Sequence, residues 1–247
     1  MSVKSKKIFV TGASGNIGKY LVDRLLKAGF KIIVLTRNPS LIYGVKNIEV
    51  VVADILEIDK YKKQMCSCQY VFHLAVYQNI FDKKYDEFKR VNVDGLKLII
   101  EALKDSNVIK MFYVSTTMVL NKVDMNNNYV RSKFEALKIV KVSKIPWIVI
   151  YPSIVVDLKI KNKNIFLNFL TNGIPGGLMM RLCNKNKKFN YIWIEKLVES
   201  MFELIEKGVA HGDYIIKGKE FTADNYLKEA YKRIGKKYIP WRIPIFQ

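Results

Sequence analysis

Apolar positions follow two alternating patterns through the first 156 residues of the chain. Short runs of β-branched and aromatic residues alternate with segments whose apolar residues recur at helical spacing, as at Ile17, Leu21 and Leu25. The short runs predict strands over Lys7–Val10, Lys31–Leu35, Ile48–Val52, Tyr70–Leu74, Met111–Ser115 and Trp147–Tyr151. The helical spacing predicts helices over Ile17–Lys27, Glu87–Leu103, Tyr129–Val142, Ile194–Lys207 and Thr222–Ile234.

Strands that are separated by helices are typical of βαβ units, whose right-handed crossovers build a doubly wound parallel sheet with helices on both faces. We therefore predict an α/β Rossmann fold in which residues 1–156 form a dinucleotide-binding core. The pattern then loosens, and we expect residues 157–247 to form a small substrate lobe interleaved with the last elements of the core. Ligands of such sheets bind at the carboxyl ends of the strands, so the loops there are the candidates for a site.

The first of these loops is rich in glycine. It reads TGASGNIG from Thr11 to Gly18, directly after a predicted strand and at the start of a predicted helix. Gly12 permits a tight turn, Gly15 lets the backbone approach a pyrophosphate, and Gly18 lets the helix pack closely on the strands. The free N–H groups and positive dipole end of the helix favour an anion. This context predicts dinucleotide binding.

Three further loops refine the cofactor prediction. The second strand ends with Arg37 where NAD-binding folds usually carry a carboxylate, so we predict NADP in preference to NAD; the alternative is a surface arginine on a turn. Asp54 can accept a hydrogen bond from the adenine amino group or cap a helix. Ala75 leaves room for the backbone to run beneath a cofactor, and His73 is expected to be a packed, hydrogen-bonded histidine.

A candidate acid/base pair follows the fifth predicted strand, which ends in the hydroxyls of Ser115, Thr116 and Thr117. Tyr129 and Lys133 are four residues apart and therefore share one helix face. A nearby ammonium group favours phenolate and lowers the pKa of a tyrosine, which makes the phenol a usable general acid/base. An exposed pair on a solvated helix is the alternative.

Composition excludes several classes of protein. Half of the 247 residues are hydrophobic, so the chain can bury a core, and no run reaches the ~18 apolar residues of a membrane-spanning helix. We expect a cytoplasmic protein with reduced cysteines and no metal site, since three cysteines and two histidines supply few ligands. The net charge of +20 comes from lysines spread along the chain, so nucleic-acid binding is an unfavoured alternative.

The ordered motifs TGASGNIG, VFHLAV, NVDGLKLIIEAL, FYVSTT, YVRSK and PWIVIYPS resemble the extended short-chain dehydrogenase/reductase family. That family includes NAD-dependent epimerase/dehydratases and dihydroflavonol-reductase-like enzymes. The resemblance runs from about residue 7 to residue 156 and implies the cofactor contacts Gly12, Ser14, Gly15, Asn16, Ile17, Gly18, Arg37, Asp54, Pro152 and Ser153. From their own positions in the sequence, Ala75 and Lys133 are also expected to contact the cofactor, Lys133 through the nicotinamide ribose. It also implies that Tyr129 and Lys133 are the catalytic pair and Thr117 their hydroxyl partner, with Ser115 as the alternative.

Departures from the family pattern narrow the function. No carboxylate adjoins Thr117, whereas dehydratases carry one for elimination, and the C-terminal lobe is short for a nucleotide-sugar substrate. We therefore predict an NADP-dependent oxidoreductase that acts on a small carbonyl or alcohol. An NAD-dependent epimerase/dehydratase and a non-catalytic NADP-binding sensor are the alternatives. The resemblance further implies a homodimer formed through the helices predicted over Glu87–Leu103 and Tyr129–Val142.

Overall fold

The computed structural model describes residues 6–41, 47–79, 84–159, 174, 180, 184, 186 and 188–240. The chain forms two compact units. Unit 1 consists of Met1–Pro152 and Glu195–Ile216, and unit 2 consists of Ser153–Ile194 and Lys217–Gln247. The chain thus leaves the first unit after Pro152 and later returns to it for one more helix and strand. The assignment of residues 157–247 as a substrate lobe stays a prediction.

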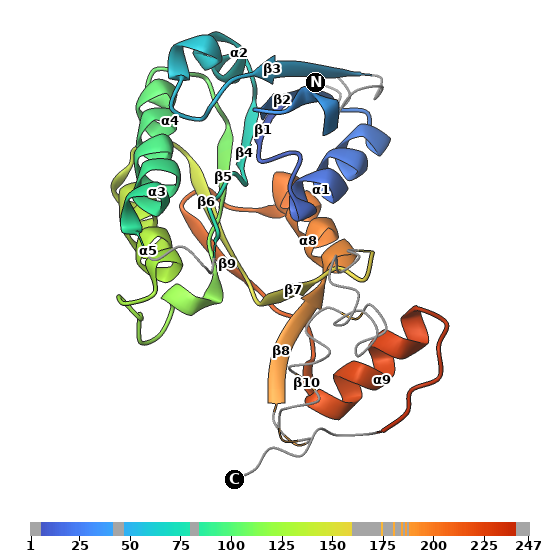
Figure 1. Ribbon diagram of the computed structural model, residues 1–247. Coiled ribbons are helices and arrows are strands. Elements are labelled where there is room, and N and C mark those ends of the chain that lie inside the picture. Colours follow the sequence, from blue (N-terminus) through green and yellow to red (C-terminus); the bar gives the residue numbers. More distant parts are fainter. Residues whose placement is uncertain are drawn as a thin grey trace. The chain divides into compact units, whose positions relative to one another are not determined.

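Unit 1 is built on a seven-stranded sheet with the order β3-β2-β1-β4-β5-β6-β9, in which every neighbouring pair is parallel (Figure 1). Its strands are β1 (Lys7–Thr11), β2 (Lys31–Thr36), β3 (Ile48–Val52), β4 (Tyr70–His73), β5 (Lys110–Val114), β6 (Trp147–Pro152) and β9 (Gly212–Ile216). The predicted doubly wound Rossmann fold is confirmed. The alternating exposure of β9 at the sheet edge gives no continuous apolar run, so the sequence pattern did not predict this strand.

Helices cover both faces of this sheet. Figure 1 shows α1 (Asn16–Lys27) and α8 (Ile194–Lys207) on one face, and α3 (Tyr85–Lys89), α4 (Gly95–Leu103) and α5 (Asn128–Val142) on the other. The short α2 (Lys62–Cys66) precedes β4. The single helix predicted over Glu87–Leu103 is interrupted, because a π-helical turn, η4 (Arg90–Asp94), joins α3 to α4. Three 3₁₀ turns complete the unit: η2 (Pro39–Leu41), η3 (Ile58–Lys60) and η5 (Thr117–Val119).

Burial in the core explains why the central strands are continuous apolar runs in the sequence. Side chains of a parallel strand are buried on both faces when helices cover the sheet. On β1 this leaves Phe9 and its neighbours without exposed surface. The rings of Phe72 and Phe112 stack across β4 and β5 at 4.2 Å between centroids. The other face packs Phe9, Val71 and Tyr113 against Leu96 and Ile99 of α4. These contacts fix the strand ends from which the candidate site is built.

The described part of unit 2 contains a small sheet with the order β10-β8-β7 and the helix α9. Its elements are β7 (Ile154–Val156), β8 (Lys188–Trp193), β10 (Glu220–Thr222) and α9 (Ala223–Arg233). Thr222 caps α9 by accepting a hydrogen bond from the N–H of Asn225. Tyr191 on β8 packs edge-on against Tyr226 of α9, with 4.8 Å between ring centroids. These aromatic contacts lie within the core of unit 2.

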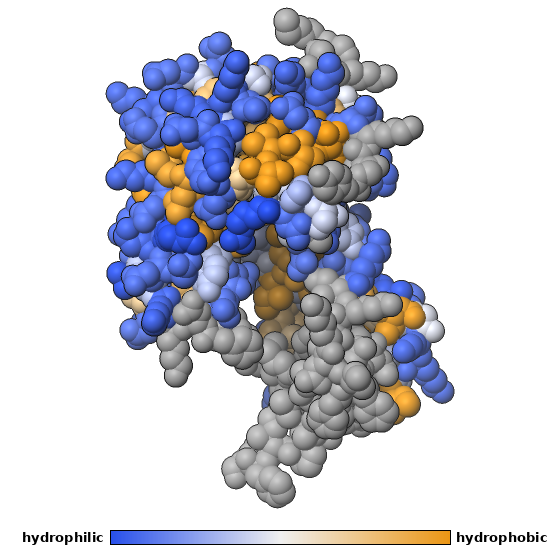
Figure 2. All heavy atoms as spheres, turned by 45° about the horizontal axis from the view of Figure 1, so that its top comes forward, coloured by the Kyte–Doolittle hydropathy of each residue, from blue (hydrophilic) through white to orange (hydrophobic). Residues whose placement is uncertain are grey.

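On the face shown in Figure 2, the described residues are mostly hydrophilic, with apolar side chains gathered in patches. No helix among the residues that the structure describes is long and apolar enough to span a bilayer.

Candidate functional site

The turn between β1 and α1 lies directly on the backbone that follows β4. Gly12 has φ +71°, and a Cβ there would come within 2.6 Å of the Ala75 nitrogen. The N–H of Gly15 donates to the Gly12 carbonyl at 3.0 Å and closes the turn. A Cβ on Gly18 would lie 2.2 Å from the same carbonyl oxygen. Two of the predicted glycines are therefore required by close backbone contacts.

Gly15 is the N-cap residue of α1, and no side chain caps this helix. The first N–H groups of a helix lack internal partners and carry the positive end of its dipole, so they suit an anion. A Cβ on Gly15 would meet only the Gly12 oxygen, at 3.2 Å. Ser14 lines the adjoining cavity, Asn16 starts the helix in an exposed position, and Ile17 is half-buried. The uncapped helix end and open glycine fit the diphosphate of a dinucleotide.

Thr11 joins the glycine turn to the end of β4. Its hydroxyl oxygen lies 3.2 Å from the Leu74 nitrogen and 3.1 Å from the Ala75 nitrogen, and it accepts from both N–H groups. The same hydroxyl lies 2.9 Å from Nδ1 of His73, to which it can donate its only proton. Burial lowers the pKa of His73 to about 3, so Nδ1 is available as an acceptor. Sequence reasoning did not assign a role to Thr11, although this residue opens the glycine motif.

A cavity of about 280 Å³ lies beside the glycine turn. Several predicted cofactor residues from separate loops line it together: Gly12, Ser14, Gly15, Arg37, Asp54 and Ala75. The side chain of Arg37 is 75% exposed, and its Nη1 lies 3.8 Å from Oδ2 of Asp54. Oδ1 of Asp54 accepts from the N–H of Leu56 within a turn. Asp54 does not cap a helix, because η3 begins only at Ile58 and has Glu57 as its N-cap residue. The contact of Asp54 with adenine stays a prediction.

Tyr129 lies in the first turn of α5, where Asn127 caps the helix by accepting from the Val130 N–H. Burial raises the pKa of the half-buried Tyr129 phenol, and a hydrogen bond from the Thr116 hydroxyl opposes this rise. The hydroxyl that lowers the pKa of the phenol is therefore that of Thr116, whereas the sequence favours Thr117. Thr117 begins η5 and is partly exposed, so its predicted role toward a substrate stays a prediction.

Lys133 is buried one helical turn further along α5, with 4% of its surface exposed. Its ammonium nitrogen lies 2.6 Å from the Val114 carbonyl oxygen and 4.3 Å from the ring centre of Tyr113. Burial without a carboxylate partner lowers the pKa of Lys133 to about 7. The sequence had led us to expect that Lys133 lowers the pKa of Tyr129. In the protein alone burial dominates instead, and the pKa of the phenol is raised.

A buried amide holds α5 against the loop after β4. The side-chain amide of Asn92, on η4, exchanges hydrogen bonds with the backbone of Tyr77 at 2.7 and 3.0 Å. Its Nδ2 also donates to the Ser132 hydroxyl at 2.9 Å, and that hydroxyl donates to the Tyr129 carbonyl at 2.8 Å. The turn that carries Tyr129 is thereby fixed in position relative to the cofactor loop.

The last two predicted cofactor residues lie at the boundary between the two units along the sequence. Pro152 ends β6 in unit 1, and Ser153 begins unit 2. The Ser153 hydroxyl is buried and has no hydrogen-bond partner among the described residues. No group of three metal-ligating side chains occurs in the described part of the chain. The carboxyl ends of β1, β4 and β5 thus bring together the glycine turn, Ala75 and the candidate acid/base pair.

Comparison with known proteins places this site in a family. Residues 12–172, more than half of the chain, match a family model described as NAD(P)H-binding. The chain belongs to the extended short-chain dehydrogenase/reductase family. This membership confirms the resemblance on which the residue assignments rest, but it does not test the individual residues.

Individual relatives agree with the family. A 2-alkyl-3-oxoalkanoate reductase of Shewanella oneidensis is 31% identical over 119 residues, which are 48% of this chain and 30% of the relative. The dihydroflavonol 4-reductase of Gerbera hybrida is 24% identical over 274 residues, covering 96% of this chain and 75% of the relative. The matches to the first three curated relatives span only 30–39% of their lengths.

Solved structures show the same fold. Bordetella bronchiseptica WbmH in complex with NAD+ superposes with a TM-score of 0.77 at 18% identity, covering 97% of this chain and 85% of that one. The UDP-glucuronic acid 4-epimerase of Bacillus cereus, in complex with NAD, gives 0.76 at 18% identity, with 96% and 87% covered. At this identity the likeness concerns the fold alone.

The buried His73 predicts a specific acid sensitivity. Its folded pKa of about 3 lies below the ordinary 6.5, so the unfolded chain binds a proton that the folded chain does not between these values. Stability is therefore lost as the pH falls below 6.5, by about 2 kcal/mol at pH 5 from this group. Urea denaturation of His73→Asn should show a smaller loss between pH 7 and pH 5 than the unsubstituted protein.

His211→Asn is the matched control, since it replaces the exposed histidine of the chain at a residue with φ +60°, which asparagine tolerates. This control should keep the acid-dependent loss of the unsubstituted protein. Equal losses in the His73 variant and the unsubstituted protein would contradict the prediction.

Proposed function

We propose that the protein is an NADP-dependent oxidoreductase that interconverts a small carbonyl compound and its alcohol. The observation that carries this proposal is the placement of Tyr129 one helical turn from the buried amine of Lys133, which donates to the Val114 carbonyl at the end of β5. Thr116, which follows β5, lowers the pKa of the Tyr129 phenol. All three groups lie after or against β5, at the carboxyl-terminal end of the parallel strands, where the glycine turn also lies. Family membership supports a nicotinamide dinucleotide as the partner of this constellation.

The described residues fit such a cofactor. The uncapped start of α1 and the Gly15 backbone would hold the diphosphate, and the cavity beside Arg37 and Asp54 would take the adenosine part. Ala75 would lie beneath the dinucleotide, and Lys133 would donate to the nicotinamide ribose. When it is bound, the nicotinamide supplies or accepts a hydride.

Residues of the protein itself would transfer the proton to and from the substrate oxygen. In the reducing direction the Tyr129 phenol donates its proton to the substrate oxygen, and in the oxidising direction the phenolate takes that proton back. The Thr116 hydroxyl stabilises the phenolate by donating to its oxygen. Asn92 and Ser132 keep the helix turn in place, so the phenol is positioned before a substrate arrives. In this scheme Thr117 hydrogen-bonds the substrate oxygen.

Removing the phenol tests the reaction directly. Tyr129→Phe should lower turnover by roughly 10²–10⁴-fold, the usual contribution of a general acid/base. NADP affinity should change little, since the phenol is not among the residues lining the adenosine cavity. Oxidation of NADPH with a panel of aldehydes and ketones measures the effect. Tyr70→Phe, at the opposite end of β4, is the control and should stay active. Full activity of the Tyr129 variant would refute the assignment.

The pH dependence of activity can distinguish the proposed roles of Thr116 and Thr117. The Thr116 hydroxyl lowers the pKa of Tyr129, so Thr116→Val should raise that pKa and move the rise of alcohol oxidation to higher pH. Thr117→Val should lower kcat without moving the profile, because its proposed partner is the substrate. Profiles of kcat/KM between pH 6 and pH 10 distinguish the two variants. An unchanged profile in the Thr116 variant would show that this hydroxyl does not act on the phenol.

Cofactor preference is tested at Arg37. An exposed guanidinium beside the adenosine cavity favours a phosphomonoester over a hydroxyl, so the protein should bind NADP more tightly than NAD. Arg37→Ala should lose about tenfold in NADP affinity, the worth of one charged hydrogen bond. NAD affinity should change less than twofold, as measured by calorimetric titration. Equal affinities of the unsubstituted protein for the two cofactors would overturn the NADP proposal.

A further inference from the structure

A second guanidinium lines the adenosine cavity. Arg90 belongs to η4, the π-helical turn between α3 and α4, whereas Arg37 follows β2. Both line the same cavity of about 280 Å³. The rest of this cavity is lined largely by apolar side chains and backbone. Two arginines that come from separate elements therefore stand out as candidate anion-binding groups.

Acidic residues accompany both arginines. Nη2 of Arg90 lies 2.9 Å and its Nε 3.3 Å from Oε2 of Glu87, which lines the cavity as well. The Asp54 carboxylate lies 3.8 Å from Arg37 and also raises the pKa of Arg90, so it lies within electrostatic reach of both guanidinium groups. The charges of these four side chains sum to zero. The cavity therefore contains two cations whose charge is balanced by two carboxylates.

The pair between Arg90 and Glu87 is weak enough to be replaced. Both hydrogen bonds go to a single carboxylate oxygen, and the two side chains are 43% and 46% exposed. Exposed ion pairs of this kind contribute about 0–1 kcal/mol. A phosphate offers three acceptor oxygens, and a guanidinium binds it with paired, charge-assisted hydrogen bonds. A phosphomonoester in the cavity would therefore compete well for Arg90.

We propose that Arg90 is a second binding residue for the 2′-phosphate of NADP and that Glu87 is a counter-charge that restrains it. The proposal rests on the proposed NADP preference and extends it to a residue outside the β2 turn. Arg90 gains a dianionic partner from NADP and none from the ribose hydroxyl of NAD, so it adds to discrimination. Glu87 repels the same phosphate and holds the guanidinium, so it limits NADP affinity.

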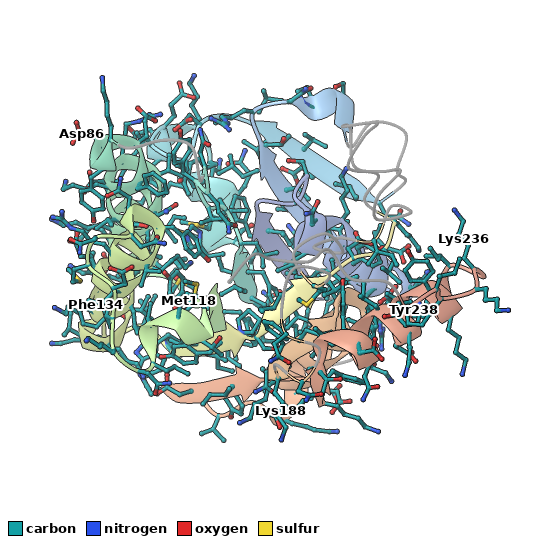
Figure 3. The ribbon with its side chains drawn as sticks, turned by 60° about the horizontal axis from the view of Figure 1, so that its bottom comes forward. Asp86, Met118, Phe134, Lys188, Lys236 and Tyr238 are labelled. Atoms are coloured by element: carbon teal, nitrogen blue, oxygen red, sulfur yellow. The ribbon has the colours of Figure 1, made fainter. Side chains whose placement is uncertain are left out.

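Asp86 provides a matched control for Glu87. It precedes Glu87 on α3, is exposed, and points away from the body of unit 1 (Figure 3). It is absent from the described cavity lining. Arg131 is the matched control for Arg90, because it is 41% exposed and pairs with a glutamate one helical turn away. Replacing either control removes one charge from the helical surface without changing the cavity.

Calorimetric titration of the full chain with NADP+ and with NAD+ tests the proposal. Arg90→Gln should weaken NADP+ binding about tenfold and NAD+ binding less than twofold, the pattern expected for loss of one charge-assisted contact to a phosphate. Glu87→Gln should strengthen NADP+ binding by about threefold or more, because it frees the guanidinium and removes a repulsive charge. Asp86→Asn and Arg131→Gln should leave the ratio of the two affinities unchanged.

The outcomes separate this inference from the proposed function. A clear NADP+ preference in the unsubstituted protein, combined with an NADP+ affinity that Arg90→Gln leaves unchanged, overturns the role of Arg90 alone. Equal binding of NADP+ and NAD+ by the unsubstituted protein overturns the NADP preference and this inference together. Retained NAD+ affinity shows that Arg90→Gln is folded. The Glu87 variant gives an independent readout, and unchanged NADP+ affinity there overturns the counter-charge role.

Discussion

The contact between the Gly12 turn and the backbone at Ala75 is the constraint on which the candidate site depends. Neighbouring strands bring the two loops together, and the Thr11 hydroxyl fastens them by accepting from two successive backbone N–H groups. Any side chain at Gly12 would force the loops apart, because its first carbon would overlap the Ala75 nitrogen. This backbone contact places the cavity beside the glycine turn and leaves the start of α1 open at the same place.

The second constraint on the site is electrostatic, because the site contains a buried amine with no carboxylate partner among the described residues. Lys133 faces a carbonyl oxygen and an aromatic ring but no carboxylate in the described structure, so its charge is costly. Tyr129 is likewise disfavoured as phenolate. Two groups that both resist ionisation in the protein alone are well suited to share a proton with an incoming ligand. Perturbed pKa values of this kind are typical of functional sites.

The sequence predicted the fold and the main loops because both depend on local patterns. Continuous apolar runs reveal buried parallel strands, and the glycine spacing reveals a turn with close backbone contacts. The edge strand β9 lacks such a run. The choice between Thr116 and Thr117 depends on which hydroxyl the start of η5 directs toward Tyr129, and spacing cannot show this. The cavity position of Arg90 depends on a helical irregularity that has no sequence signature.

That irregularity links two parts of the molecule. The widened turn η4 carries Arg90 toward the cavity beside the glycine turn and, two residues later, Asn92 toward α5. A regular α-helix would rotate all later residues by a different angle, so both side chains depend on the same extra backbone residue. Loss of one residue from this segment would shift the phase of the helix and misdirect both at once. The position of Arg90 at the cavity is therefore coupled, through a single turn, to the contact between Asn92 and α5.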